Sequence, residues 1–297
     1  MHKNNHHRAL FFAFLAAALY ALNAPLSKLL MAENAVSPSM LAGLLYLGAG
    51  IGMACVGFLQ KKAHKENGEI PLTKADLPYT IAMIVLDIAA PILLMLGIQS
   101  SSAASASLLN NFEIVATSLI ALLLFREKIS KKLWLAIGLV TLSSILLSLD
   151  TEGSLSLSTG SLLVLGACLC WGLENNCTRR LSDKNPLEIV VVKGLGSGSG
   201  ALLVAFLSGE NFPAIAYIFP ALLLGFVAYG LSIFFYIHAQ RHLGAAKTSA
   251  WYAFAPFIGA FISLLLFRQP PALLFWIALP IMILGAYLAA ADGNNEA

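Results

Sequence analysis

The sequence Leu-Leu-Leu-Phe-Arg-Glu at residues 122–127 returns almost unchanged as Leu-Leu-Leu-Phe-Arg-Gln at residues 264–269. Each copy ends a long apolar run, and Trp134 and Trp276 follow at the same distance from the phenylalanine. A second pair of segments matches in the same order, Tyr20-Ala-Leu-Asn-Ala-Pro-Leu-Ser-Lys28 and Trp171-Gly-Leu-Glu-Asn-Asn-Cys-Thr-Arg179. Because the matching segments follow one another in the same order, we interpret the chain as two copies of one unit, residues 1–150 and residues 151–297.

The composition indicates a membrane protein. Of the 297 residues, 59% are hydrophobic and 11% are charged, and the mean hydropathy is +0.81. Soluble domains carry roughly 25% charged residues, so there is too little polar surface here to cover a water-soluble globule. Disorder is excluded by the same numbers, because disordered chains are poor in apolar residues. The Lys and Arg residues lie in short clusters between apolar runs and form no basic patch, so no nucleic acid partner is expected.

Ten apolar segments are candidates for crossing a bilayer, since a spanning helix needs about 20 mostly apolar residues. We interpret the basic start and the first apolar run as a spanning helix, because the run is long for a signal peptide. Loops after even-numbered segments are rich in Lys and Arg, which places them and both termini in the cytoplasm; Lys28 and Arg268 are exceptions. The expected segments are 9–31, 38–60, 77–98, 101–125, 132–149, 160–182, 186–208, 213–238, 245–267 and 271–291.

Each copy contains five segments, so the second copy must enter the membrane upside down relative to the first. The sequence therefore predicts an all-α membrane protein with ten transmembrane helices, built as two inverted five-helix repeats. Many secondary transporters have this architecture, in which two halves rock around a shared site at the midplane. Glycines spaced four apart, Gly48 with Gly52 and Gly196 with Gly200, indicate close helix packing rather than a nucleotide loop.

With these features the chain resembles the EamA-domain branch of the drug/metabolite transporter superfamily. Besides the two-repeat layout, the resemblance rests on Trp171-Gly172, the basic end of the sixth segment, the leucine-rich run closing on Glu127, and Gly244-Ala245-Ala246. The family exports amino acids, metabolites and drugs. The resemblance thus implies an exporter in the cell's inner (plasma) membrane, without identifying its substrate.

The chain departs from the family pattern in its fourth and ninth segments. The family often has a proline within both segments, and here Pro256 is present in the ninth but Asn110-Asn111-Phe112-Glu113 stands in the fourth. Gln269 replaces the acid that usually closes the ninth segment. The first departure suggests a subgroup with its own chemistry at the fourth segment.

Four ionisable residues lie well inside expected spans: Asp87, Glu113, Glu174 and Lys193. Each costs about 2.5–3.5 kcal/mol on insertion scales, so they must face the bundle interior. Glu113 shares a helical face with Asn110 and Thr117, and we interpret it as a carboxylate that exchanges protons or binds substrate. The alternative is a structural ion pair with Lys193. A Glu174–Lys193 pair is equally consistent with the sequence, and Asp87 is a further proton candidate.

A set of polar and aromatic residues accompanies these charges. Glu174 shares a face with Trp171, Asn175 and Thr178, and its repeat counterpart Asn23 lies with Tyr20. Asn23 and Glu174 are therefore expected to face each other across a cavity, as suits a small polar solute with an apolar part. The alternative is hydrogen bonding between helices. Trp251 and Tyr252 are expected either to line the same cavity or to pack against other side chains.

We therefore expect a secondary transporter of small metabolites, such as amino acids, that exports them by alternating access and exchanges them for protons. The alternatives are a uniporter or exchanger of an organic ion, a membrane-embedded enzyme, or an assembly factor. No nucleophile–base motif supports an enzyme. No third ligand joins His238 and His242, so neither metal nor other cofactor is expected. The expected partners are a small-molecule substrate, the proton and the lipid bilayer, and the sequence fits a monomer or a homodimer.

Overall fold

The computed structural model describes residues 2–62, 69–125, 130–149, 158–181, 183–243, 252–269 and 271–292. Over these ranges the chain is mainly helical, and an isolated β-bridge joins Ile70 to Lys184. The first half contains α1 (His2–Ala21), α2 (Asn23–Leu30), η1 (Ala32–Asn34), α3 (Pro38–Lys62), η2 (Lys74–Asp76), α4 (Leu77–Gln99), α5 (Ala103–Leu109), α6 (Phe112–Phe125) and α7 (Lys131–Ser148). The second contains α8 (Thr159–Arg179), α9 (Pro186–Leu207), α10 (Ile215–Gly225), η3 (Phe226–Leu231), α11 (Ser232–Leu243), α13 (Ala255–Phe267) and α14 (Leu273–Asp292).

Helices occupy the described parts of all ten expected segments, and the all-α membrane fold agrees with the prediction. Length and composition alone qualify six stretches of the described chain as membrane-spanning. These stretches are Arg8–Leu30, Pro38–Gln60, Lys74–Gln99, Ala103–Leu123, Pro186–Leu207 and Ile215–Ala239. Two more apolar helices, Ala255–Phe267 and Leu273–Ala289, are shorter.

Three expected helices are not continuous, which the sequence analysis did not predict. The first segment breaks at Leu22, between α1 and α2. Pro25 explains this break, because it has no N–H to donate to the carbonyl of Ala21 four residues earlier. The fourth segment breaks at Asn110 and Asn111, whose side chains compete with helical hydrogen bonding. The eighth segment contains the π-helical turn η3 between α10 and α11.

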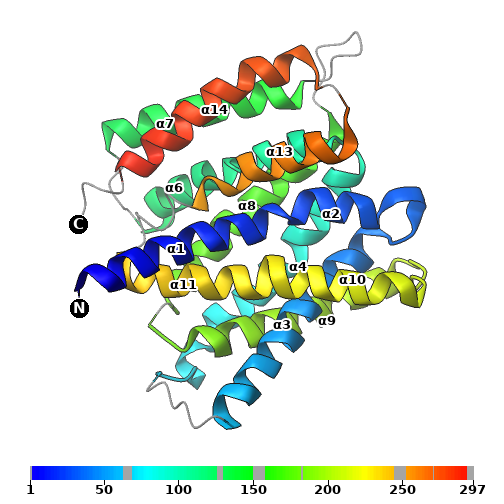
Figure 1. Ribbon diagram of the computed structural model, residues 1–297, viewed down its shortest axis with the longest axis vertical. Helices are drawn as coiled ribbons and strands as arrows, with labels where there is room; N and C mark the ends of the chain where they lie inside the picture. Colours follow the sequence, from blue (N-terminus) through cyan, green and yellow to red (C-terminus); the bar gives the residue numbers. More distant parts are fainter. Residues whose placement is uncertain are drawn as a thin grey trace.

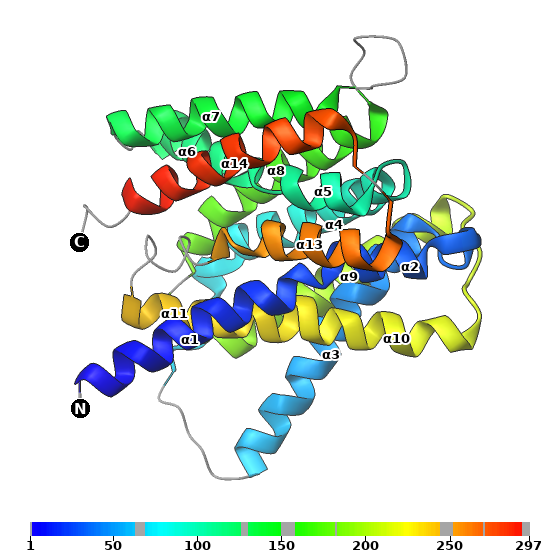
Figure 2. The same cartoon turned by 45° about the horizontal axis from the view of Figure 1, so that its top comes forward.

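The helices pack in pairs that join distant parts of the chain. Figure 1 shows α7 beside α14, and α1 beside α11. Further close pairs are α3 with α9, α4 with α8, and α5 with α13. In both views the start of α1 and the end of α14 lie at the same end of the bundle (Figures 1 and 2). Most of the buried apolar side chains form one continuous core between these helices.

Lys28, an exception to the expected charge pattern, has a structural role. Its Nζ donates to the carbonyl oxygens of Ile98 at 2.6 Å, Gln99 at 2.8 Å and Ser101 at 2.8 Å. These carbonyls lie at and just beyond the C-terminal end of α4, where helical donors run out and a cation is favourable. The lysine thus joins α2 to the end of α4.

Glycines allow α3 to approach its neighbours closely, as their spacing predicted. A Cβ atom built on Gly225 would overlap the carbonyl oxygen of Leu45 on α3, and one on Gly48 would overlap that of Leu222 on α10. The contact between α3 and α10 is therefore backbone against backbone. In α7, by contrast, a Cβ on Gly138 would meet nothing within 4 Å.

This packing predicts opposite effects for two glycine-to-alanine changes. Gly225→Ala should destabilise the protein by about 1–3 kcal/mol, because the new methyl group forces α10 away from α3. Gly138→Ala should be neutral or stabilising by up to about 1 kcal/mol, because alanine favours the helix. Thermal unfolding midpoints of the purified variants in one detergent test this. Equal midpoints for the two variants would contradict the described packing.

Candidate functional site

A buried cluster of three charged side chains lies where α4, α8 and α9 meet. The Nζ of Lys193 on α9 lies 2.9 Å from Oε1 of Glu174 on α8 and 3.0 Å from Oδ2 of Asp87 on α4. All three residues are buried, with exposed fractions of 6%, 2% and 0%. The expected Glu174–Lys193 pair is therefore present, and Asp87 joins it.

A hydroxyl group donates to one oxygen of each acid. Tyr46 on α3 donates its hydroxyl to Oδ1 of Asp87 at 2.9 Å, and Thr178 donates to Oε1 of Glu174 one helical turn away. Buried ions are tolerated only when such additional hydrogen bonds satisfy their remaining lone pairs. Two carboxyl groups thus share one ammonium group inside an apolar bundle.

Glu113 belongs to a separate polar group between α6 and α8. The amide Nδ2 of Asn175 donates to Oε1 of Glu113 at 2.6 Å and lies 3.3 Å from the hydroxyl of Thr117. The predicted shared face of Glu113 and Thr117 is thus directed at Asn175. The alternative Glu113–Lys193 pair is not formed, because the ammonium of Lys193 is taken by Asp87 and Glu174.

Tyrosine rings connect the polar groups of the two halves. Tyr229 lies between Tyr46 and Tyr20, with ring centroids 5.0 Å and 5.8 Å away, and Tyr252 lies 5.5 Å from Tyr20. Asn23 donates to the hydroxyl of Tyr229 at 2.9 Å. Asn23 was expected to face Glu174, and its amide instead contacts Tyr229.

The structure describes two of the other three aromatic residues that were predicted to line the site. Trp171 is buried in the main apolar core, which fits packing. Tyr252 packs on Tyr20 and Tyr236. Trp251 lies outside the described residues.

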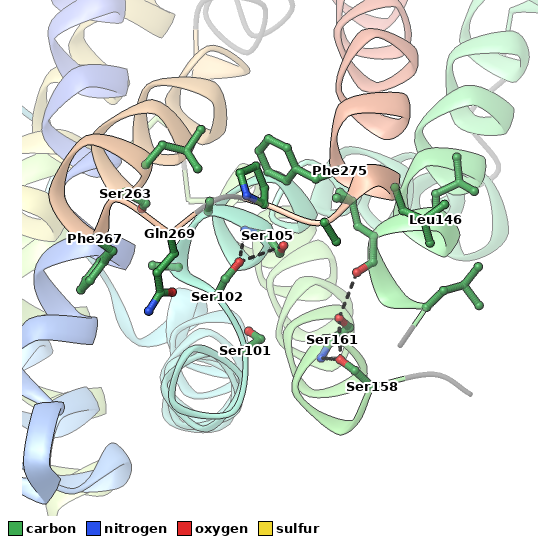
Figure 3. A pocket seen from close by; sticks show the side chains of 18 of the residues that line it. Ser101, Ser102, Ser105, Leu146, Ser158, Ser161, Ser263, Phe267, Gln269 and Phe275 are labelled. Atoms are coloured by element: carbon green, nitrogen blue, oxygen red, sulfur yellow. Dashed lines mark hydrogen bonds between the residues drawn. The ribbon is translucent and has the colours of Figure 1, made fainter. Parts of the chain in front are cut away.

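A cavity of about 330 Å³ lies at the end of the bundle where α14 begins, opposite the start of α1 (Figures 1 and 3). Figure 3 shows serines from several elements around it: Ser101, Ser102, Ser105, Ser158, Ser161 and Ser263. Leu146, Phe267 and Phe275 supply apolar walls. None of these serines is among the site residues predicted from the sequence. Four serines within residues 100–105, between two apolar runs, were the available signal.

A second, much smaller cavity of about 10 Å³ lies at the breaks between α1 and α2 and between α5 and α6. It is lined by Tyr20, Ala21, Asn23, Ala24, Ser107, Asn110, Ala255, Pro256 and Gly259. Helices α5 and α13 contribute to both cavities. Asn110, which was expected beside Glu113 and Thr117, thus has its place at this cavity.

Comparisons with known proteins agree with these features. The sequence profile of the EamA-like transporter family matches residues 7–149 and residues 158–291. An "Uncharacterized transporter" of Methanothermobacter thermautotrophicus is 24% identical over 94% of this chain and 85% of that protein. "Uncharacterized transporter YyaM" of Bacillus subtilis is 23% identical over 65% of this chain and 66% of that protein.

A solved structure, described only as "Crystal structure of protein", has the same fold. It superposes with a TM-score of 0.69 at 16% sequence identity, over 97% of each chain. Together with the apolar helices, the family match over both halves makes this a multi-pass membrane transporter. The chain belongs to the EamA-like transporter family.

Proposed function

We propose that the protein is a secondary transporter that exports small metabolites, such as amino acids, in exchange for protons. The observation that carries this proposal is the imbalance of buried charge. Asp87 and Glu174 supply two buried carboxyl groups and Glu113 supplies a half-buried one, and among the described residues only Lys193 is a buried cation. Ionised carboxylates without a counter-charge are costly in such surroundings. A proton or a cationic substrate group removes that cost.

The helix pairs support two inverted repeats, residues 1–150 and residues 151–297. In the proposed repeats the first segment corresponds to the sixth, and the third segment corresponds to the eighth. The pair α1 with α11 then becomes the pair α8 with α4, and both pairs are present. The pairs α3 with α9, α5 with α13 and α7 with α14 map onto themselves. The two separate stretches that match the family profile support the same division.

The cavities support alternating access. The 330 Å³ cavity lies at the end of the bundle that the charge pattern assigns to the outside, and the 10 Å³ cavity lies deeper along the same helices α5 and α13. We infer that the structure represents a state in which the 10 Å³ cavity is closed and the 330 Å³ cavity is open to the outside. Both termini would then lie in the cytoplasm, with the protein in the inner membrane.

A second candidate, exchange of an organic cation without protons, is favoured by the tyrosine rings beside the carboxylates. Ring faces and acids together bind cations. Glu113 would then serve only as a substrate ligand.

Replacing Glu113 tests the export mechanism. Metabolites in the medium and in the cells would be profiled for an export-deficient host carrying the wild type, Glu113→Gln or Glu33→Gln. Glu33 lies exposed in η1, so its variant is a matched control. We expect one class of compound to accumulate outside with the wild type and with Glu33→Gln. With Glu113→Gln it should fall to the level of the empty host.

Two results of that comparison would count against the proposal. Export that is the same in Glu113→Gln as in the wild type would remove Glu113 from the mechanism. An unchanged profile with well-inserted wild-type protein would count against export itself.

Neutralising the ion cluster separates its structural role from its transport role. Lys193→Met alone leaves Asp87 and Glu174 without their cation and should destabilise the protein by about 3–5 kcal/mol. Adding Asp87→Asn and Glu174→Gln should recover much of that loss, while export stays abolished. Thermal unfolding and the export assay measure the two effects. Full export by the stable triple variant would show that the cluster is only structural.

A further inference from the structure

Helices α3 and α9, one from each half of the chain, lie unusually close together over most of their length. A Cβ atom added to Gly43, Gly50 or Gly57 of α3 would lie 2.6, 2.6 or 2.8 Å from an atom of α9. A Cβ atom added to Gly194 or Gly198 of α9 would lie 2.4 or 2.6 Å from the backbone of α3. Sliding one helix along the other would bring a side chain to a place where only a glycine fits. The packing therefore favours movement of the two helices as one body.

Hydrogen bonds join the same two helices at the end that the charge pattern assigns to the cytoplasm. There the segment that follows α3 is bonded to the start of α9. The backbone nitrogen of Asn185 donates to the carbonyl oxygen of Ile70 at 2.8 Å. The backbone nitrogen of Leu72 donates to Oε2 of Glu188 at 3.0 Å. We call this set of contacts the inner clasp.

A second set of contacts, the outer clasp, joins the helices at the opposite end. The chain turns back after α9 at Gly209, whose φ is +72°. The next residue, Glu210, accepts from the hydroxyl of Ser37 at 2.6 Å and from the backbone nitrogen of Met40 at 2.9 Å, both at the start of α3. In each clasp, the segment that follows one helix is bonded to the start of the other. The two clasps are thus related as the proposed inverted repeats are.

Both clasps are closed in the same structure. Inverted repeats exchange their roles between the inside-open and outside-open arrangements. A clasp that opened the inner face would therefore have an outer counterpart that is open while the inner clasp is closed. Here both are formed, although the 330 Å³ cavity lies at the outer end. The clasps accordingly hold α3 and α9 together and do not open in turn.

The segment α5–α6 has the opposite character. It is broken at Asn110 and Asn111. Asn111 is 2% exposed, and neither polar atom of its amide has a hydrogen-bond partner among the described residues. The same is true of the Oγ of Ser107, four residues earlier and also 2% exposed. Buried polar atoms without partners are rare in folded proteins and can store strain. This segment is therefore held less firmly than α3 and α9.

We propose that α3 and α9 form a rigid frame that keeps one arrangement throughout transport, and that the broken segment α5–α6 moves against this frame to open the inner face. The amide of Asn111 then gains hydrogen-bond partners in the inside-open arrangement. Lys193 belongs to the frame and Glu113 to the moving segment, so the movement changes the distance between these two charges. This inference rests on the alternating access of the proposed function.

Distances between pairs of spin labels test the inference without a transport assay. The labels would be attached to cysteines in the purified full-length chain in lipid, after the four native cysteines are replaced by alanine. Leu59 on α3, Leu207 on α9 and Leu123 on α6 are exposed positions. The pair Leu59 and Leu207 reports on the frame and should give one distance under all conditions. The pair Leu59 and Leu123 should give two, since a transporter samples both arrangements. Two distances within the frame, or a single distance for both pairs, would overturn the inference.

Asn111→Ala tests the part assigned to the unpaired amide. The variant should give a single Leu59–Leu123 distance, because the inside-open arrangement loses the hydrogen bonds that favour it. Its thermal unfolding midpoint should not fall, because the amide has no partner to lose among the described residues. Two distances in this variant would overturn the role of Asn111.

A disulfide across the inner clasp tests the frame in the export assay. Ile70 and Lys184 form a β-bridge, in which partners lie about 4.8 Å apart, within reach of a disulfide. The double variant Ile70→Cys with Lys184→Cys should export equally well when oxidised and when reduced. Each single variant is the control for the loss of its own contacts, such as the ion pair of Lys184 with Asp76. Loss of export on oxidation, restored by a reductant, would overturn the frame.

The outcomes separate the inference from the proposed function. If the wild type exports and the oxidised clasp blocks export, the frame fails and the function stands. If the spin-label distances behave as expected and the wild type exports nothing, the function fails and the frame stands.

Discussion

The contact between Lys193 and its two carboxylate partners is the constraint on which the centre of the bundle depends. An ammonium group and two acids cannot stay ionised in an apolar interior unless they lie within hydrogen-bonding distance of one another. That requirement brings α4, α8 and α9 together, and Tyr46 ties α3 to the same point through Asp87. A Cβ atom built on Gly194, next to Lys193, would lie 2.4 Å from the backbone nitrogen of Gly50, so glycines also let α9 approach α3 closely at this point.

The two helix junctions that the proposed repeats relate, α4 with α8 and α1 with α11, differ in chemistry. In the proposed repeats Glu174 takes the place of Asn23, and Tyr229 follows Asp87 at the same separation as Trp276 follows Trp134, so it takes the place of Asp87. Asn23 and Tyr229 are hydrogen-bonded at 2.9 Å, and Glu174 and Asp87 are joined through Lys193, so each junction has a polar contact. One contact is charged and the other neutral. In this account, the charged junction manages protons.

Much of the framework followed from local sequence. Pro38 and Pro186 mark helix starts that the structure reproduces, since proline fits the first turn of a helix. The ion pair of Glu174 with Lys193 was one of two predicted options, because buried charges must find partners. The choice between Asp87 and Glu113 as second partner was not predictable, because it depends on how α4 and α6 are placed around α8. The breaks at Leu22 and Asn110 were missed, because each span was taken as one helix on length and apolarity alone.

The most direct test of proton-coupled export is to measure whether a proton gradient drives movement of the solute. The purified protein would be placed in lipid vesicles loaded with the solute that profiling identifies, and solute flux would be followed while a pH gradient is imposed. The account predicts that the gradient drives the solute against its own concentration difference, and that a proton ionophore abolishes this accumulation. Flux that follows the solute gradient alone, with or without the ionophore, would contradict it.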